Sequence, residues 1–361
     1  MAIQPPNPPR TWRILELDAL RGLAALAVVL FHYTTRFDEL FGYAAPPLFS
    51  FSGGGYGVDL FFMLSGFVIL MTLERTRRPG DFIVGRFSRL YPTYWACLVL
   101  TFLTVAAVGL PGQQVGLRDA LLNGTMLQQM LGAEHVDEAY WSLQVELLFY
   151  VAMLVLYRFG AFRRPLTTTL LWTALCLVVH TAATTLGETL PTVAGGLAKV
   201  QTLLSLRYFP EFAVGIVLYD ARRRGALSPR HVLAIAVALA VHGAMDSWAS
   251  AAVLSCLAAV LYLATSGRLA VVAARPLVFL GAISYPLYLT HQNIGYVLLR
   301  ATGEAGIPPA AGIAMAITLS ILLAWLIARW VERPAMSAIR GWWKSHRERS
   351  AVRQTSPAGA A

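Results

Sequence analysis

The sequence predicts an all-α polytopic membrane protein with about ten transmembrane helices and both termini in the cytoplasm. Hydrophobic residues fill 57% of the 361 positions and charged residues only 13%, which is too apolar for an ordinary soluble core. The apolar residues form runs of roughly 20, the length that spans the hydrocarbon of a bilayer. Lysine and arginine gather between alternate runs, as orientation signals do in membrane proteins.

Ten apolar runs define the expected spans. Their approximate limits are residues 14–36, 55–73, 91–110, 140–158, 167–186, 203–219, 231–247, 249–266, 277–300 and 309–330. The sixth run is the weakest, because it contains Arg207, Pro210 and Glu211. We expect three regions: a cytoplasmic segment 1–13, a transmembrane domain 14–334, and a basic, disordered cytoplasmic tail 335–361. The tail is polar and ends in Ser, Pro, Gly and Ala, a composition typical of disorder.

The positive charges give the predicted orientation. With the N-terminus inside, 24 of the 29 lysine and arginine residues fall on the cytoplasmic side. The other five are Arg36, Arg118, Lys199, Arg207 and Arg300. This asymmetry favours an even number of spans. It also accounts for the net charge of +10 without a nucleic-acid partner, since the basic residues lie in short runs between apolar segments.

The cysteines and the first span exclude several other classes. Cys97, Cys176 and Cys256 each stand alone in an apolar run, so we expect neither a disulfide framework nor a metal site. Asp18 and Arg21 interrupt the first apolar run, and a cleavable signal peptide tolerates such charges poorly. We therefore expect the first helix to remain in the mature protein.

Ionisable residues inside the spans are the candidates for function, because a charge in the bilayer is expensive unless it is paired or used. Arg21 and His32 are eleven residues apart, so they share nearly one helix face at an axial separation of about 16 Å. The predicted topology puts Arg21 near the cytoplasm and His32 toward the outside. Alternatively, the two residues only mark the helix ends at the lipid interface. The other charged or ionisable residues in the spans are Asp18, Asp59, Glu146, Arg207, Glu211 and His291.

Two further arginines follow the second span on the cytoplasmic side. Arg86 and Arg89 lie at i, i+3 in GRFSRLYPTYW, which places both guanidinium groups on one helical face. Such a pair suits a phosphate or pyrophosphate group. The simpler interpretation is that they are ordinary positive-inside residues or contacts to lipid headgroups.

Polar residues also gather toward the outer side. Trp141, Ser142 and Glu146 occur in YWSLQVELLFY, and His291 in SYPLYLTHQ is expected at a similar depth. A buried glutamate can orient a histidine or act itself as an acid or base. The alternative for each residue is an interhelical hydrogen bond. The pattern thus predicts anion binding inside and acid–base chemistry outside.

These motifs resemble acyltransferase family 3, the OafA-like membrane O-acetyltransferases. The resemblance covers about residues 15–334, in matching order and spacing. It rests on ELDALRGLAALAVVLFHY, GVDLFFMLSGFVI, GRFSRLYPTYW, YWSLQVELLFY, RYFPEFAVGIVLY, SYPLYLTHQ and VERP. Some members of this family carry an additional SGNH-type esterase domain, and this sequence is similar to the stand-alone members.

The resemblance implies an acyl-CoA donor, usually acetyl-CoA, whose phosphates would bind Arg21, Arg86 and Arg89. His32 would be catalytic together with Glu146, which would orient the imidazole. The acceptor side would include Trp141, Ser142, His291, Arg207 and Glu211. The implied acceptor is a glycan or lipid-linked sugar outside the cytoplasm, and the implied location is the bacterial inner membrane, among membrane lipids. No metal is implied.

A polytopic transporter or exporter of an acylated or anionic solute is the alternative function. Its intramembrane charges would coordinate a solute or relay protons, and its hydropathy would be the same. It does not explain why anion-binding residues and acid–base residues separate to opposite sides. The sequence identifies neither the acceptor nor the acyl chain, and it leaves open direct transfer and an acyl-enzyme.

Overall fold

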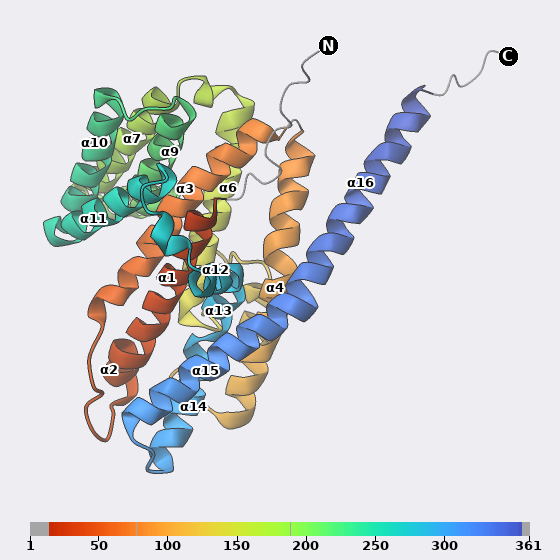
Figure 1. The fold of residues 1–361 in the computed structure, drawn as a ribbon. Helices are drawn as coiled ribbons and strands as arrows, with labels where there is room; N and C mark the ends of the chain where they lie inside the picture. Colours follow the sequence, from red (N-terminus) through yellow and green to blue (C-terminus); the bar gives the residue numbers. More distant parts are fainter. Residues whose placement is uncertain (1–13, 77, 188, 356–361) are drawn as a thin grey trace.

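The protein is all-helical, as the sequence predicted. The computed structural model describes residues 14–76, 78–187 and 189–355, and these ranges contain no strand. The predicted segment 1–13 and the tail end 356–361 lie outside the described residues. The α-helices, shown in Figure 1, are α1 Leu15–Phe31, α2 Phe37–Phe41, α3 Gly57–Arg75, α4 Pro79–Val108, α5 Leu117–Asn123, α6 Trp141–Arg158, α7 Pro165–Thr185, α8 Pro191–Leu203, α9 Phe209–Arg223, α10 Pro229–Met245, α11 Trp248–Thr265, α12 Arg275–Ala282, α13 Ser284–Thr290, α14 Gln292–Glu304, α15 Pro309–Ile327 and α16 Arg333–Thr355.

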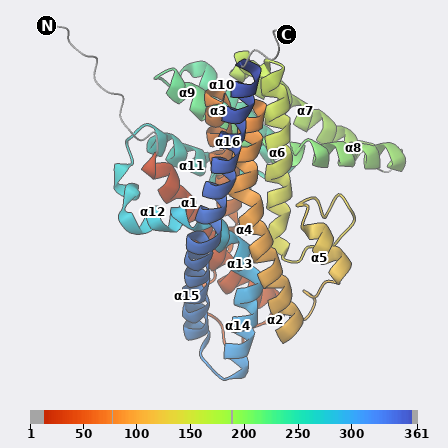
Figure 2. The same cartoon turned by 90° about the vertical axis from the view of Figure 1, so that its right-hand side faces the viewer.

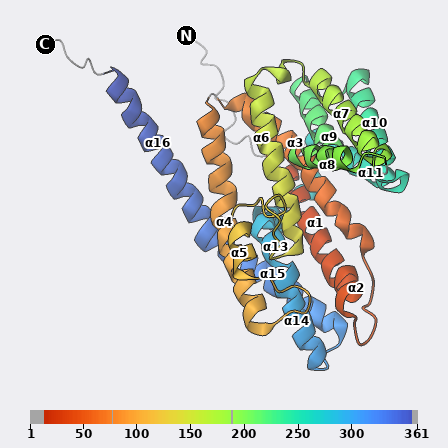
Figure 3. The same cartoon turned by 180° about the vertical axis from the view of Figure 1, so that it is seen from behind.

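The helices form two groups. In the views of Figures 1 and 3, α7, α9, α10 and α11 gather on one side, and α1, α4, α6 and α13–α15 form the rest of the bundle. Helix α3 joins the groups through a very close contact with α9. A Cβ atom added at Gly215 would lie 1.9 Å from the carbonyl oxygen of Met63, and one at Gly66 would lie 2.1 Å from that of Phe212. Small residues allow membrane helices to approach this closely.

Six helical segments among the described residues are long and apolar enough to cross a membrane. They are Ser52–Arg75, Pro79–Val108, Glu138–Arg158, Pro165–Thr185, Trp248–Thr265 and Pro309–Arg349. A shorter apolar helix spans Pro229–Met245. The predicted number of ten spans is not confirmed. One reason is that the expected helix 277–300 is divided into α12, α13 and α14, with His291 between the last two.

Two π-helical turns join successive α-helices into longer continuous helical segments. The first, His32–Arg36, joins α1 to α2, and the second, Ala328–Glu332, joins α15 to α16. Such turns insert an extra residue into a helix and often occur at functional sites. Here each of them carries an ionisable side chain, His32 or Glu332, into the interior of the bundle.

The C-terminal region differs from the expected disordered tail, because it continues as α16. This helix runs beside the first part of α4 (Figure 2). Trp343 and Arg347 donate hydrogen bonds of 2.8 Å and 2.7 Å to one carboxylate oxygen of Asp81 on α4. A polar composition predicts disorder only when the polar groups lack partners, and α4 provides them here. Helix α4 also begins twelve residues before the expected start at 91.

Candidate active site

The candidate site residues line two cavities among the described residues. The arginine cavity, of about 810 Å³, is lined by residues that include Asp18, Arg21, Arg86, Arg89, Ser142, Glu146, Tyr150, Glu332, Arg333 and Arg340. The histidine cavity, of about 440 Å³, is lined by residues that include His32, Arg36, Glu39, Asp59, Glu138, Trp141, Arg207, Tyr208, Glu211, His242, Asp246 and Ser250. Both volumes are in the range of pockets that hold small ligands.

The two cavities are adjacent, because Val58 and Tyr288 line both of them. Arg21 and His32, predicted to share one helix face, lie on one helical rod but line different cavities. A molecule that entered the arginine cavity past Arg21 would therefore approach His32 near Tyr288. This shared wall is where two ligands could meet.

The cavities carry opposite charge. Five arginines and three carboxylates line the arginine cavity, whereas two arginines and five carboxylates line the histidine cavity. Charges at low dielectric interact strongly, so the sign of the lining selects the sign of the ligand. An anion is favoured in the first cavity and disfavoured in the second.

Within the arginine cavity, some guanidinium groups have carboxylate partners and others do not. Arg89 pairs with Glu332, whose side chain is only 3% exposed, and Arg21 lies 3.7 Å from Asp18. Arg86 instead donates a 3.4 Å hydrogen bond to the Thr72 hydroxyl. Among the described residues no carboxylate is within ion-pair distance of Arg86. The three arginines predicted to bind an anion thus line one cavity, and Arg86 retains the least compensated charge.

Glu146 does not lie where the sequence suggested. We expected it on the outer side, beside His32, but it lines the arginine cavity. Its Oε1 accepts hydrogen bonds of 2.9 Å from Ser65 and 2.5 Å from the Tyr150 hydroxyl. Ser65 lies on α3 and Tyr150 on α6. The position expected for Glu146 is taken by His291.

His32 and His291 form a hydrogen-bonded pair with an assignable proton arrangement. Nδ1 of His291 lies 2.8 Å from the Tyr288 carbonyl, which only accepts, so this nitrogen carries a proton. In the neutral ring Nε2 is then an acceptor, and it lies 3.2 Å from Nδ1 of His32. That Nδ1 also lies 2.9 Å from the Val28 carbonyl and must donate. The network therefore assigns the lone pair of neutral His32 to Nε2.

Several contacts fix His291 in place. Its side chain is fully buried, and its carbonyl oxygen accepts a 2.6 Å hydrogen bond from the Tyr33 hydroxyl. Tyr140 donates a 3.0 Å hydrogen bond to the carbonyl of Leu289, on the same segment. A Cβ atom at Gly295 would lie 2.1 Å from the Tyr33 hydroxyl, so only glycine permits this approach. The result is a rigid support for the His32 ring.

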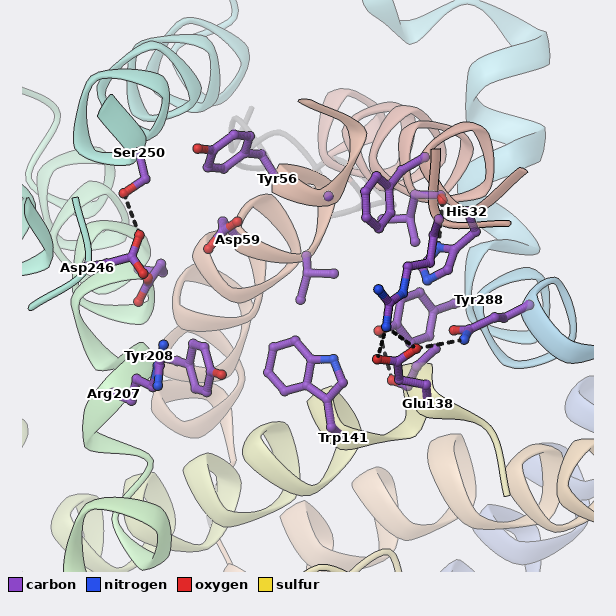
Figure 4. A pocket seen from close by; sticks show the side chains of 18 of the residues that line it. His32, Tyr56, Asp59, Glu138, Trp141, Arg207, Tyr208, Asp246, Ser250 and Tyr288 are labelled. Carbon is purple, nitrogen blue, oxygen red and sulfur yellow. Dashed lines mark hydrogen bonds and ion pairs between the residues drawn. The ribbon is translucent and has the colours of Figure 1, made fainter. Parts of the chain in front are cut away.

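The wall opposite His32 is polar and rich in carboxylates. Figure 4 shows Asp59, Asp246 and Ser250 facing His32 across the histidine cavity, with Trp141 between the two sides. On this wall Oε1 of the buried Glu211 lies 2.8 Å from Nδ1 of His242. The rings of Trp141 and Tyr208 pack with centroids 4.9 Å apart. Carboxylates beside aromatic faces suit a ligand with both hydroxyl groups and C–H surfaces.

The predicted acceptor residues divide between the cavities. Trp141, Arg207 and Glu211 line the histidine cavity, but Ser142 lines the arginine cavity and donates toward or accepts from the Tyr288 hydroxyl at 2.7 Å. Sequence reasoning missed the contact of His291 with His32, because neither spacing nor composition relates helices so far apart. It also missed Glu332, although VERP offered a carboxylate in the closing motif. The other residues missed on these walls were Tyr288, His242, Asp246, Ser250 and Arg340.

His32 lines the acidic cavity near the wall that this cavity shares with the arginine-rich one, an arrangement suited to passing a group between two substrates. Several of the surrounding helices are long and apolar enough to cross a membrane. The fold and site thus define a membrane-embedded transferase. The chain belongs to acyltransferase family 3, since the family model described as the acyltransferase domain matches residues 14–329.

Curated relatives agree with this family. The chain is 31% identical to the acyltransferase MdmB of Streptomyces mycarofaciens, over 42% of this chain and 41% of that protein. It is 26% identical to the O-acetyltransferase OatA of Staphylococcus aureus, over 88% of this chain and 56% of that protein. It is 39% identical to protein 2 in the picA locus of Rhizobium radiobacter, over 29% of this chain and 53% of that protein. The matches thus span about half or less of these relatives. No solved structure matches the chain.

Proposed function

We propose that this protein is a membrane-bound O-acyltransferase of the bacterial inner membrane. It transfers an acyl group, in the simplest case acetyl, from cytoplasmic acyl-CoA to a hydroxyl of a glycan outside the cytoplasm. The observation that carries this proposal is the pair of oppositely charged cavities that meet at Tyr288, beside His32. Membership of acyltransferase family 3 and the O-acetyltransferase among the relatives support it.

The arginine cavity is the donor side. Acyl-CoA carries a pyrophosphate and a ribose phosphate, and Arg86 with Arg89 and Arg21 provides the matching positive charge. The axial distance of about 16 Å from Arg21 to His32 is comparable to the reach of an extended pantetheine arm. A donor bound by its phosphates in this cavity would therefore present its thioester near the shared wall.

His32 is the general base of the proposed reaction. Its Nε2 accepts the proton of the acceptor hydroxyl while the hydroxyl oxygen forms a bond to the thioester carbonyl carbon. The carbon–sulfur bond then breaks, and the imidazolium returns the proton to the departing thiolate, which leaves as free CoA. His291 accepts the Nδ1 proton of His32 in a hydrogen bond throughout, so it is a positioning residue.

The histidine cavity is the acceptor side. Its excess of carboxylates disfavours an acceptor that brings a phosphate or carboxylate into the cavity. Its carboxylates can accept hydrogen bonds from the hydroxyl groups of a sugar, and the Trp141 and Tyr208 rings can pack against its C–H surface. The cavity therefore favours a neutral or amino sugar. O-antigen, exopolysaccharide and lipid-linked sugars remain candidates when the sugar unit that enters is uncharged or cationic.

The proposal is tested with purified protein in vesicles, acetyl-CoA labelled in the acetyl group, and an envelope glycan fraction from the host lacking the gene. We expect label to enter the glycan as an alkali-labile ester, together with one free CoA per ester. His180 lies on α7 outside both cavities, so His180→Ala should form the ester like the wild type. Solute movement across the vesicle without ester formation would favour the exporter and contradict the proposal.

A further inference from the structure

Helix α16 contributes two arginines, Arg333 and Arg340, to the lining of the arginine cavity. This helix runs antiparallel to the first part of α4, and side-chain contacts follow one another along the two helices. Arg89 pairs with Glu332 at one end, and Arg347 pairs with Asp81 at the other. Between them Arg340 donates hydrogen bonds to the Ser88 hydroxyl at 3.1 Å and the Gly85 carbonyl at 3.4 Å, and it lines the cavity.

Arg340 keeps its charge available for a ligand. Its two hydrogen-bond partners are neutral, and among the residues described no carboxylate lies within ion-pair distance of it. Arg86 on α4 is in the same situation, since it contacts the Thr72 hydroxyl and lies over the rings of Phe82 and Tyr150. Two uncompensated guanidinium groups from different helices therefore line one cavity. A site of this kind suits a ligand with more than one phosphate.

Arg340 lies on α16 beyond Glu332, the carboxylate that pairs with Arg89. It follows Glu332 by eight residues, which is about 12 Å along the axis of α16 and away from the level of Arg89. Its residue is exposed, whereas Glu332 is buried, so Arg340 lies toward the mouth of the cavity. In acyl-CoA the phosphate farthest from the thioester, by bonds, is the 3′-phosphate of the ribose.

We propose that Arg340 binds the 3′-phosphate of the acyl-CoA nucleotide, while Arg86 binds the pyrophosphate. This inference rests on the proposed function, because it presumes an acyl-CoA donor. Helix α16 is then part of the donor site. It discriminates the phosphorylated coenzyme from analogues without that phosphate.

The test compares two ligands and three proteins. Dissociation constants of acetyl-CoA and 3′-dephospho-acetyl-CoA are measured in an uncharged detergent for the wild type, Arg340→Ala and Arg349→Ala. Arg349 lies nine residues farther along α16, which puts it on the opposite face of the helix. We expect Arg340→Ala to weaken acetyl-CoA binding about tenfold or more and to leave the dephospho ligand unchanged. Arg349→Ala should match the wild type.

Several results would overturn the assignment. Equally weaker binding of both ligands would mean that Arg340 binds the pyrophosphate or supports α4, and unchanged binding would mean that it does not bind the donor.

Repeating the measurement in phosphatidylcholine and phosphatidylglycerol vesicles separates a lipid headgroup from the coenzyme. If Arg340→Ala changed the dissociation constant of acetyl-CoA only in phosphatidylglycerol vesicles, the ligand of Arg340 would be the lipid headgroup. A wild type that binds neither ligand would instead overturn the proposed donor. Equal melting temperatures of the variants exclude misfolding.

Discussion

The arginine cavity and the histidine cavity share the wall at Val58 and Tyr288, but the net charges of their lining residues have opposite signs. In the first, positive side chains outnumber negative ones, and Arg86 and Arg340 have no carboxylate partner among the described residues. In the second, carboxylates outnumber arginines, and a histidine with an available lone pair faces them. In the proposed reaction this difference assigns donor binding to one cavity and proton transfer to the other.

This separation has a chemical reason. A base that accepts a proton works poorly beside several cations, because the cations disfavour its protonated form. Placing His32 on the acidic side and the arginines proposed to bind phosphate on the other avoids that conflict. Substitutions should therefore damage donor binding and proton transfer independently.

The largest expected effect is that of His32→Ala. Loss of a general base should lower the turnover number for acyl transfer roughly 100- to 10,000-fold. The assay is release of free CoA from acetyl-CoA in the presence of the envelope glycan fraction. His180→Ala should retain wild-type turnover, and a His32→Ala protein with full activity would remove His32 from the mechanism.

The next effect concerns the partner of His32. His291→Phe removes one of the two acceptors of the Nδ1 proton and leaves only the Val28 carbonyl, so turnover should fall about 10- to 100-fold while the KM for acetyl-CoA stays near the wild-type value. His291→Gln provides a carbonyl acceptor, and we expect it to recover part of the loss. Equal defects in both variants would show that His291 only fills space.

A smaller effect is expected on the wall opposite His32. Asp59→Asn replaces a carboxylate of the histidine cavity by an amide of the same shape, and it should raise the KM for the glycan severalfold through weaker hydrogen bonds. The KM for acetyl-CoA should not change. Asp119→Asn, on α5 outside both cavities, is the control. A change confined to the acetyl-CoA KM would contradict the separation.

The smallest effect is expected for Glu332→Gln, which should strengthen acetyl-CoA binding rather than weaken it. Removing this buried carboxylate leaves Arg89 without its partner, so the arginine cavity becomes more positive. Acetyl-CoA should bind about two- to fivefold more tightly by simple charge addition. Loss of the buried pair should also lower the melting temperature in detergent. Weaker acetyl-CoA binding in a folded protein would show that Glu332 orients Arg89 for the donor.

The sequence predicted the parts of the site that depend on one helix, and it failed where separate helices meet. The i, i+3 spacing predicted that Arg86 and Arg89 share one face of α4, and both line one cavity with Arg21. Glu146 was assigned to the outer side from its depth alone, but the direction of its side chain is set by Ser65 and Tyr150, to which it is hydrogen-bonded.

Packing against a partner also explains the differences in the fold. The expected helix 277–300 is broken into shorter pieces, and its segment around His291 is held by the Tyr33 and Tyr140 hydroxyls. The tail was expected to be disordered from its polar composition, yet α16 finds its partners on α4. Such contacts join residues more than a hundred positions apart, which local composition does not reveal.

The central claim is that donor binding and catalysis belong to different cavities, and the most direct measurement is the dissociation constant of acetyl-CoA for Arg86→Ala and His32→Ala. Arg158→Ala, an exposed arginine at the end of α6, is the control. We predict that Arg86→Ala weakens binding about tenfold or more, while His32→Ala and Arg158→Ala bind like the wild type. Equal loss of binding in Arg86→Ala and His32→Ala, or wild-type binding by Arg86→Ala, would contradict the account.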